Sequence, residues 1–320
     1  MFKYLCTGLI LAGCFSIVAQ DIKDEDVKAQ EFTYEKPTEW SVYASNEPVS
    51  TFTIAGDELW YATPASVFVA SIKKRTVQKH PTLGTIPGSD VTCMTVDGNT
   101  VWIGGKNGVA MHSGGKFTAF TAENGLPDNS VNALFAVGGK VWVGTDKGLA
   151  CYSGGSWKVY TTKEGLSHDK VNALVADGSG NIWVGTQKGI SVYNGSGWTI
   201  WDMKKGLSWN NVKALAYDPR KKVIWAAVGE KDVNNFKNGE WNTFMDIREG
   251  ITSIMVDSQS RVWIGSSSGL MKYNGDEWID DPKQLYIPAA QVQWMQRDSA
   301  GNLFYACENG VVRLSNPYPF

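Results

Sequence analysis

Hydrophobic and polar positions alternate along short segments through most of the chain, a pattern typical of β-strands that are buried on one face. The segments Val131 to Val137, Val171 to Ala176 and Ile251 to Val256 show this alternation, and polar turns such as residues 177–181 follow them. Next come an apolar-Trp-apolar-Gly segment, a third strand such as Gly148 to Tyr152, and a fourth strand rich in aromatic residues. The pattern predicts an all-β protein made of four-stranded antiparallel units.

The second strand of this unit recurs about every 40 residues, and its aromatic residue marks seven copies. The seven aromatic residues are Trp60, Trp102, Trp142, Trp183, Trp225, Trp263 and Phe304. Units of this length and strand content indicate a seven-bladed β-propeller, with the aromatic residues packed between blades as a structural repeat.

Two features of the repeat predict how the ring is built. A glycine stands four residues after the small residue of the second strand, and we expect it to end a three-residue hairpin loop with positive φ. These glycines are Gly108, Gly148, Gly189, Gly269 and Gly310. The seventh unit ends too soon for a fourth strand, whereas Trp40-Ser41-Val42-Tyr43 repeats the fourth-strand pattern before the first unit. We therefore predict that the N-terminal strand closes the last blade of a propeller spanning residues 39–320.

The first twenty residues have the pattern of a secretory signal peptide. Lys3 precedes an apolar stretch at residues 4–19, and residues 21–38 form a charged segment that we interpret as a linker. Cleavage after Gln20 and a lipobox ending in Cys14 both fit the sequence. We favour simple cleavage because the chain stays apolar after Cys14, although lipidation of Cys14 remains the alternative. The signal pattern therefore predicts an extracytoplasmic protein, either periplasmic or on the cell surface, and no later segment is apolar enough over the length of a membrane span.

Composition and charge narrow the function. The formal net charge of -2, with 30 basic and 32 acidic residues, gives no basic field for nucleic acid. The chain has 14 Trp and 12 Tyr but only 3 His, which suits a surface that binds a ligand better than a proton-transfer enzyme. Beyond the predicted signal peptide, Cys93, Cys151 and Cys307 lack the spacing of a disulfide framework or a metal site, so we expect three buried thiols.

The segments from Gly125 to Leu149 and from Gly165 to Ile190 resemble the two-component regulator propeller repeat. That repeat occurs mainly in Bacteroidetes, where tandem propellers form the extracytoplasmic sensors of hybrid histidine kinases that detect glycan fragments. The resemblance implies a propeller that binds a ligand. The sequence given has one propeller and no kinase or immunoglobulin-like domain, so we expect it to need another protein in order to signal.

Ligand-binding candidates fall in the loops that lead from each fourth strand to the next blade, around the mouth of the central channel. After the Gly-Leu pair of three successive loops, one column contains Asp128, His168 and Trp209, whose chemistry differs from loop to loop. Their neighbours complete the predicted set, which is Asp128, Asn129, His168, Asp169, Trp209, Asn210 and Asn211. Trp209 could stack on a sugar ring or simply pack on a neighbouring blade. A second column, Asn132, Asn172 and Lys213, would face the channel as a ligand contact or as a solvated wall.

The sequence supports an enzymatic function less well than a binding function. The segment from Asp177 to Trp183 resembles an aspartate box of sialidases, but the arginine cluster of those enzymes has no counterpart. A propeller lyase of the streptogramin type would need a histidine and a carboxylate with a metal at the mouth, and only His168 lies in such a loop. We predict a binding module without catalytic residues, cofactor or dedicated metal site, with calcium at Asp-rich turns left open. Its partner would be a glycan, a peptide or a protein of the cell envelope, the last as an interaction scaffold.

Overall fold

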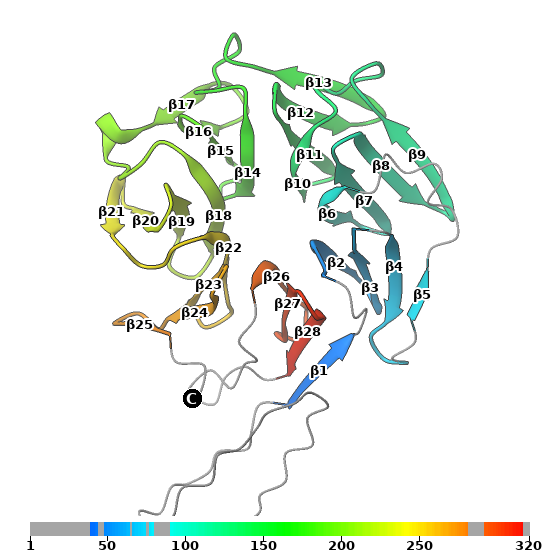
Figure 1. Ribbon diagram of the computed structural model, residues 1–320. Helices are drawn as coiled ribbons and strands as arrows, with labels where there is room; N and C mark the ends of the chain where they lie inside the picture. Colours follow the sequence, from blue (N-terminus) through cyan, green and yellow to red (C-terminus); the bar gives the residue numbers. More distant parts are fainter. Residues whose placement is uncertain are drawn as a thin grey trace, which may run out of the picture. The chain divides into compact units, whose positions relative to one another are not determined.

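The computed structural model describes residues 39–43, 48–64, 66–74, 77–79, 90–280 and 291–315. The strands form seven four-stranded antiparallel sheets, which are arranged as the blades of a propeller around a central opening (Figure 1). This confirms the predicted seven-bladed, all-β fold. The predicted signal peptide (1–20) and linker (21–38) lie outside the described residues. In the described part of the chain, no helix has the length and hydropathy that a membrane span requires.

The blades are numbered here by the order of their first strands. Blade 1 contains β2 (Thr51–Ala55), β3 (Glu58–Ala62), β4 (Val67–Ser71) and β5 (Val77–Lys79). Blade 2 contains β6 (Val91–Asp97), β7 (Thr100–Gly105), β8 (Gly108–Ser113) and β9 (Lys116–Phe120). Blade 3 contains β10 (Val131–Val137), β11 (Lys140–Thr145), β12 (Gly148–Ser153) and β13 (Ser156–Tyr160). Blade 4 contains β14 (Val171–Ala176), β15 (Ile182–Thr186), β16 (Gly189–Tyr193) and β17 (Trp198–Trp201).

Blade 5 contains β18 (Val212–Asp218), β19 (Val223–Val228), β20 (Asp232–Lys237) and β21 (Glu240–Phe244). Blade 6 contains β22 (Ile251–Val256), β23 (Val262–Ser266), β24 (Gly269–Tyr273) and β25 (Trp278–Ile279). Blade 7 contains β26 (Val292–Arg297), β27 (Leu303–Cys307), β28 (Gly310–Ser315) and the N-terminal strand β1 (Glu39–Tyr43). One short 3-10 helix, η2 (Met203–Lys205), lies between blades 4 and 5.

The ring is closed by the N-terminal strand. The first strands contact their neighbours in sequence from β2 through β6, β10, β14, β18, β22 and β26, and β26 contacts β2 again. Strand β1 pairs with β28 in antiparallel register, with Tyr43 opposite Val311, so it is the fourth strand of blade 7. Tyr43 is buried, and its ring stacks on Phe304 at 6.1 Å between centroids. The predicted closure is therefore confirmed, and the pairing covers an edge that would otherwise stay exposed.

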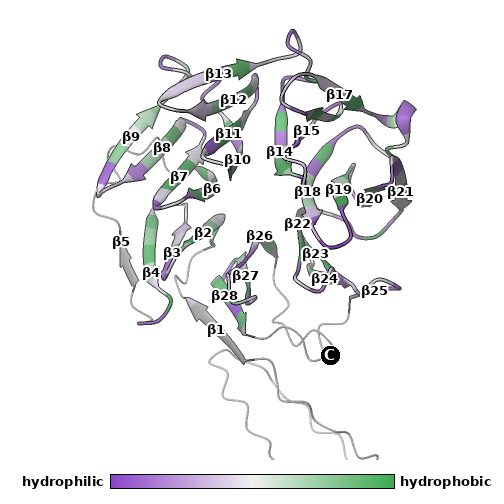
Figure 2. Cartoon of the chain, turned by 180° about the vertical axis from the view of Figure 1, so that it is seen from behind, coloured by the Kyte–Doolittle hydropathy of each residue, from purple (hydrophilic) through white to green (hydrophobic). Residues whose placement is uncertain are grey.

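The hydrophobic core lies between blades. All seven aromatic residues of the repeat are buried, and each hydrophobic cluster joins side chains of two neighbouring blades, as Trp102 of blade 2 packs with Leu134 of blade 3. Figure 2 shows that hydrophobic residues gather in the strands and hydrophilic residues at the turns. The three thiols, Cys93, Cys151 and Cys307, are free and buried as expected. Blade-to-blade packing explains why the repeat keeps a large aromatic residue at this position.

The hairpin between the second and third strands differs from the prediction. Gly148 pairs with Thr145, so the loop has two residues and the glycine belongs to the strand. Its φ is +145°, and a Cβ there would meet the carbonyl oxygen of Tyr160 at 2.9 Å. The glycine is required because the neighbouring strand leaves no room for a side chain, as well as for its positive φ.

An aspartate fastens the turn between the first two strands of blade 4. The Asp177 carboxylate accepts hydrogen bonds from the backbone N–H groups of Ser179 and Asn181 and from the indole N–H of Trp183, at 2.9, 3.0 and 2.9 Å. Partial burial alone would raise the pKa of Asp177, but the hydrogen bonds from Trp183, Asn181 and Ser179 outweigh it and lower the pKa. The likeness to an aspartate box thus reflects a turn that anchors a core tryptophan.

Candidate functional site

The loops that precede the first strands and the hairpins between second and third strands share one end of every blade, because neighbouring strands are antiparallel. We call this end the loop face. Its loops are shaped by the Gly-Leu pair, in which the leucines Leu126, Leu166 and Leu207 are buried. Gly165 has φ +121°, and a Cβ there would meet the ring of Trp198 at 2.6 Å. The residues after Gly-Leu are therefore held in a fixed position at the mouth of the channel.

Three of the predicted ligand contacts hold the loops themselves. The side-chain oxygens of Asn129, Asp169 and Asn210 each accept a hydrogen bond from the backbone N–H seven residues earlier. The three distances are 2.7, 2.7 and 2.9 Å. Each side chain folds back across its loop and stabilises the loop conformation through this hydrogen bond.

Asp128 and His168 form tight turns in the same loops. The Asp128 carboxylate accepts the N–H of Ser130 at 2.9 Å and pairs with Lys147 at 2.6 Å. Burial alone would raise the pKa of Asp128, but the hydrogen bond and charge of Lys147 and the N–H of Ser130 lower it. The Nδ1 atom of His168 accepts the N–H of Lys170 at 3.0 Å. One ring nitrogen of His168 is thus already engaged in the fold.

Trp209 occupies the same position in the third loop but makes a different contact. Its side chain is 54% exposed, and the ring lies on the backbone of Gly229, where a Cβ would meet the ring at 2.7 Å. Gly229 begins the hairpin loop 229–231 of blade 5, which has three residues. The corresponding loops after β7, β11, β15, β23 and β27 have two. Blade 5 thus supplies a longer hairpin against which the Trp209 side chain packs while more than half of the residue stays exposed.

Two exposed methionines lie in the segments that connect blade 4 to blade 5 and blade 5 to blade 6. Met203 is 51% exposed, and its N–H is bonded to the Asn210 side chain next to Trp209. Met245 is 67% exposed, and the following N–H, of Asp246, is bonded to Asp232 at the end of the hairpin. Exposed apolar side chains on the loop face are typical of a binding surface. We call the surface of Met203, Trp209 and Met245 the blade 5 patch.

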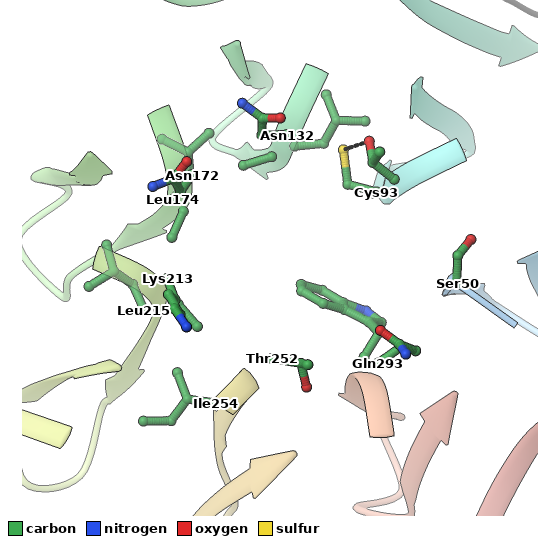
Figure 3. Close-up of a pocket in the computed structure, with 16 residues that line it drawn as sticks. Ser50, Cys93, Asn132, Asn172, Leu174, Lys213, Leu215, Thr252, Ile254 and Gln293 are labelled. Atoms are coloured by element: carbon green, nitrogen blue, oxygen red, sulfur yellow. Dashed lines mark hydrogen bonds between the residues drawn. The ribbon is translucent and has the colours of Figure 1, made fainter. Parts of the chain in front are cut away.

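The central channel contains a cavity of about 220 Å³ at the level where the first strands begin. Figure 3 shows side chains of the first strands around it, among them Asn132, Asn172, Lys213 and Gln293. In six blades the first strand has a β-bulge at its second residue, and that side chain lines the cavity.

Most of these side chains tie one blade to the next, which the sequence did not predict. Four of these six side chains, together with Ser50 just before the first strand of blade 1, donate a hydrogen bond of 2.5–3.0 Å to a carbonyl at the start of the next first strand. The donors are Ser50, Thr92, Asn132, Asn172 and Thr252, and the acceptors are Val91, Val131, Val171, Val212 and Val292. Asn132 and Asn172 therefore face the channel as expected, but their amide N–H groups are committed to the ring. We call this circle of bonds the inter-blade belt.

The structure brings the predicted residues together only in part. Asn211 lies between the two regions, since its Oδ1 is 3.5 Å from the amide of Asn172 and its carbonyl accepts the N–H of Gly229. Sequence reasoning missed Gln293 and Trp294, which line the cavity from blade 7. Their alignment with the bulge positions of the other blades would have found them. Among the described residues, no group of three acidic, histidine or cysteine side chains could hold a metal ion.

The fold and site define a seven-bladed propeller with an exposed aromatic residue on its loop face. Residues 165–188 match the family model described as two component regulator propeller, in agreement with the resemblance seen in the sequence. Blade 4 of the propeller thus contains a segment that is similar to the two component regulator propeller repeat. No curated protein matches the sequence.

Solved structures confirm the fold. The chain is similar to the extracellular domain described for the hybrid two component system BT3049 of B. thetaiotaomicron, with TM-score 0.73, 20% identity and 88% of this chain covered. It spans only 41% of that longer chain. It also resembles a streptogramin B lyase, with TM-score 0.70 and 13% identity over 87% of this chain and 97% of the lyase. YCF48 from Cyanidioschyzon merolae matches with TM-score 0.67 and 13% identity over 87% of this chain and 99% of the other.

Proposed function

We propose that this protein is an exported, non-enzymatic binding module that captures a glycan on its loop face, at the blade 5 patch. The observation that supports this most directly is Trp209, whose ring is fixed against the backbone of Gly229 and is 54% exposed. An aromatic ring that already packs against the backbone loses less conformational entropy on stacking with a sugar ring than a side chain without such a contact. The extracellular regulator domain with a similar fold supports a location outside the cytoplasm.

The position of His168 favours binding over catalysis. A propeller lyase would use a histidine at the mouth of the channel as a proton-transfer group. In this chain the Nδ1 atom of His168 accepts a backbone N–H within its own turn. The likeness to streptogramin B lyase, at 13% identity, is a likeness of fold.

A protein of the cell envelope is the second candidate partner, because Met203 and Met245 extend the exposed apolar surface beyond a single ring. Methionine side chains adapt to varied partner surfaces, so they suit a protein contact better than a sugar contact. Under this reading the propeller is an interaction scaffold, and Met203→Ser together with Met245→Ser would weaken binding while leaving oligosaccharide titrations unchanged.

The test is isothermal titration of the full-length chain with neutral hexasaccharides of glucose and of xylose. We expect saturable binding that Trp209→Ala reduces at least tenfold, about 1.4 kcal/mol, and that Trp209→Phe largely retains. Because Trp209 is exposed, both variants should unfold at the same denaturant concentration as the parent chain. Absence of binding to every neutral oligosaccharide, or binding indifferent to Trp209→Ala, would refute glycan capture at this patch. Because the Trp209→Ala variant should keep the stability of the parent chain, a change in its binding can be assigned to the lost side chain and not to unfolding.

A further inference from the structure

The inter-blade belt has two exceptions, and both line the cavity. Hydrogen bonds to the next blade come from the bulge residues Thr92, Asn132, Asn172 and Thr252 and from Ser50, which directly precedes β2. Lys213 of blade 5 instead extends to Glu230, with 3.0 Å between Nζ and Oε2. Gln293 of blade 7 makes no side-chain hydrogen bond with the described residues. The ammonium group of Lys213 and the amide of Gln293 therefore line the channel at positions where the other blades have a side chain bonded to the next blade.

The next residue in blade 7 is a third exception. Five other blades have a small, buried residue directly after the bulge, namely Cys93, Ala133, Ala173, Ala214 and Ser253. Blade 7 has Trp294, which is 36% exposed and lines the cavity. A small residue satisfies the fold at this position in the neighbouring blades, so blade packing does not require an indole there. An exposed apolar ring in a channel is unfavourable in water unless something covers it.

The remaining polar atoms of the cavity complete a specific chemistry. The amide N–H groups of Asn132 and Asn172 are used in the belt, but their Oδ1 atoms accept no hydrogen bond from the described residues. They are free to accept from hydroxyl groups of a ligand. Lys213 offers a positive charge, and its present partner Glu230 has a side chain that is 79% exposed. An ion pair to so exposed a carboxylate is weak, so a ligand carboxylate could replace it.

We propose that the central cavity binds a small ring acid that carries several hydroxyl groups, a monosaccharide uronate, at a site separate from the blade 5 patch. The carboxylate pairs with Lys213, the hydroxyl groups donate to Asn132 and Asn172, and the ring stacks on Trp294. Gln293 supplies one donor and one acceptor beside the indole. The cavity volume of about 220 Å³ is below the roughly 300–1,000 Å³ of sites for drug-sized ligands, which restricts the ligand to about one ring.

The test titrates the full-length chain with sodium D-glucuronate, D-glucose and cyclohexanecarboxylate, following heat and tryptophan fluorescence. Two variants restore what other blades have at the same positions, so each should fold: Lys213→Asn and Trp294→Ala. We expect glucuronate to bind at least tenfold more tightly than either glucose, which lacks the carboxylate, or cyclohexanecarboxylate, which lacks the hydroxyl groups. Lys213→Asn should abolish the preference for glucuronate over glucose, and Trp294→Ala should weaken both.

Several results would overturn the proposal. One is absence of saturable glucuronate binding at millimolar concentrations. Another is glucuronate binding that persists in both variants, and a third is glucuronate binding that Trp209→Ala abolishes, since this would place the sugar on the loop face. The two proposals fail independently. Trp209→Ala tests hexasaccharide capture and should leave the glucuronate titration unchanged, whereas Trp294→Ala should leave the hexasaccharide titration unchanged.

Discussion

Closure of the ring by β1 should be measurable through one buried side chain, Tyr43. Its ring is 4% exposed, stacks on Phe304 at 6.1 Å and packs in the same cluster as Phe52. Removing a buried aromatic side chain from a core costs about 3–5 kcal/mol, of which an aromatic pair accounts for roughly 1 kcal/mol. We therefore expect Tyr43→Ala to lower the free energy of unfolding by about 3–5 kcal/mol.

The assay is urea unfolding at equilibrium, followed by tryptophan fluorescence, because the core tryptophans report on blades all round the ring. Tyr43→Phe is the matched control. It removes only the hydroxyl, which donates a long hydrogen bond of 3.4 Å to the carbonyl of Ile72, and should cost about 1 kcal/mol or less. A Tyr43→Ala variant within about 0.5 kcal/mol of the parent chain would show that β1 does not hold the ring closed.

Three further predictions follow from the fold. Gly165→Ala should destabilise by about 3 kcal/mol in thermal unfolding, since it combines a positive φ with a contact against Trp198, whereas Gly154→Ala, which faces open space, should cost only about 1 kcal/mol. The pKa of Asp177 is lowered in the fold, so its contribution to stability is complete above about pH 4 and is lost as the pH falls through the folded pKa. Asp177→Asn should therefore reduce the acid dependence of the unfolding free energy. Burial raises the pKa of Cys93 to about 12, so this thiol should resist alkylation at pH 8 until urea unfolds the ring, as peptide mass spectrometry would show.

The fold could be predicted from the sequence because the repeat supplies the same information several times. One Trp strand alone would be ambiguous, but seven aromatic positions at a nearly constant interval leave few architectures. Closure was also predictable, since the strand ending at Tyr43 follows the fourth-strand pattern and blade 7 lacks that strand. The hairpin length was not, because whether Gly148 ends a loop or begins a strand depends on its pairing with Thr145. Such pairing is a tertiary property.

The candidate site was predictable only in part, because a polar residue in a loop can bond to a ligand or to its own loop. In the structure, the side chains of Asn129, Asp169 and Asn210 accept hydrogen bonds from their own loops. The recurrence of these hydrogen-bonding side chains at one position already indicated a structural role, since a side chain repeated in successive loops serves the conformation that the loops share. Trp209 differs from Asp128 and His168, which occupy the same position in their loops. A residue that departs from the repeat in this way indicates a function of that one blade. Trp294 breaks a column too, but that column becomes visible only when the bulges are aligned.

Departures from the repeat therefore separate function from architecture in this ring. In five blades a side chain at the start of the first strand donates a hydrogen bond to the next blade. Lys213 and Gln293 occupy the corresponding positions in blades 5 and 7 but do not donate this bond. A small buried residue satisfies the position after the bulge, yet Trp294 exposes an indole to the channel. Each departure removes a favourable contact or exposes apolar surface, and such local inconsistencies with the fold are expected at functional positions. Lys213→Asn tests this directly, because an asparagine there can donate to blade 6 as Asn172 does to blade 5. A variant that gains stability but loses its preference for the acidic sugar would show that Lys213 serves the ligand rather than the fold.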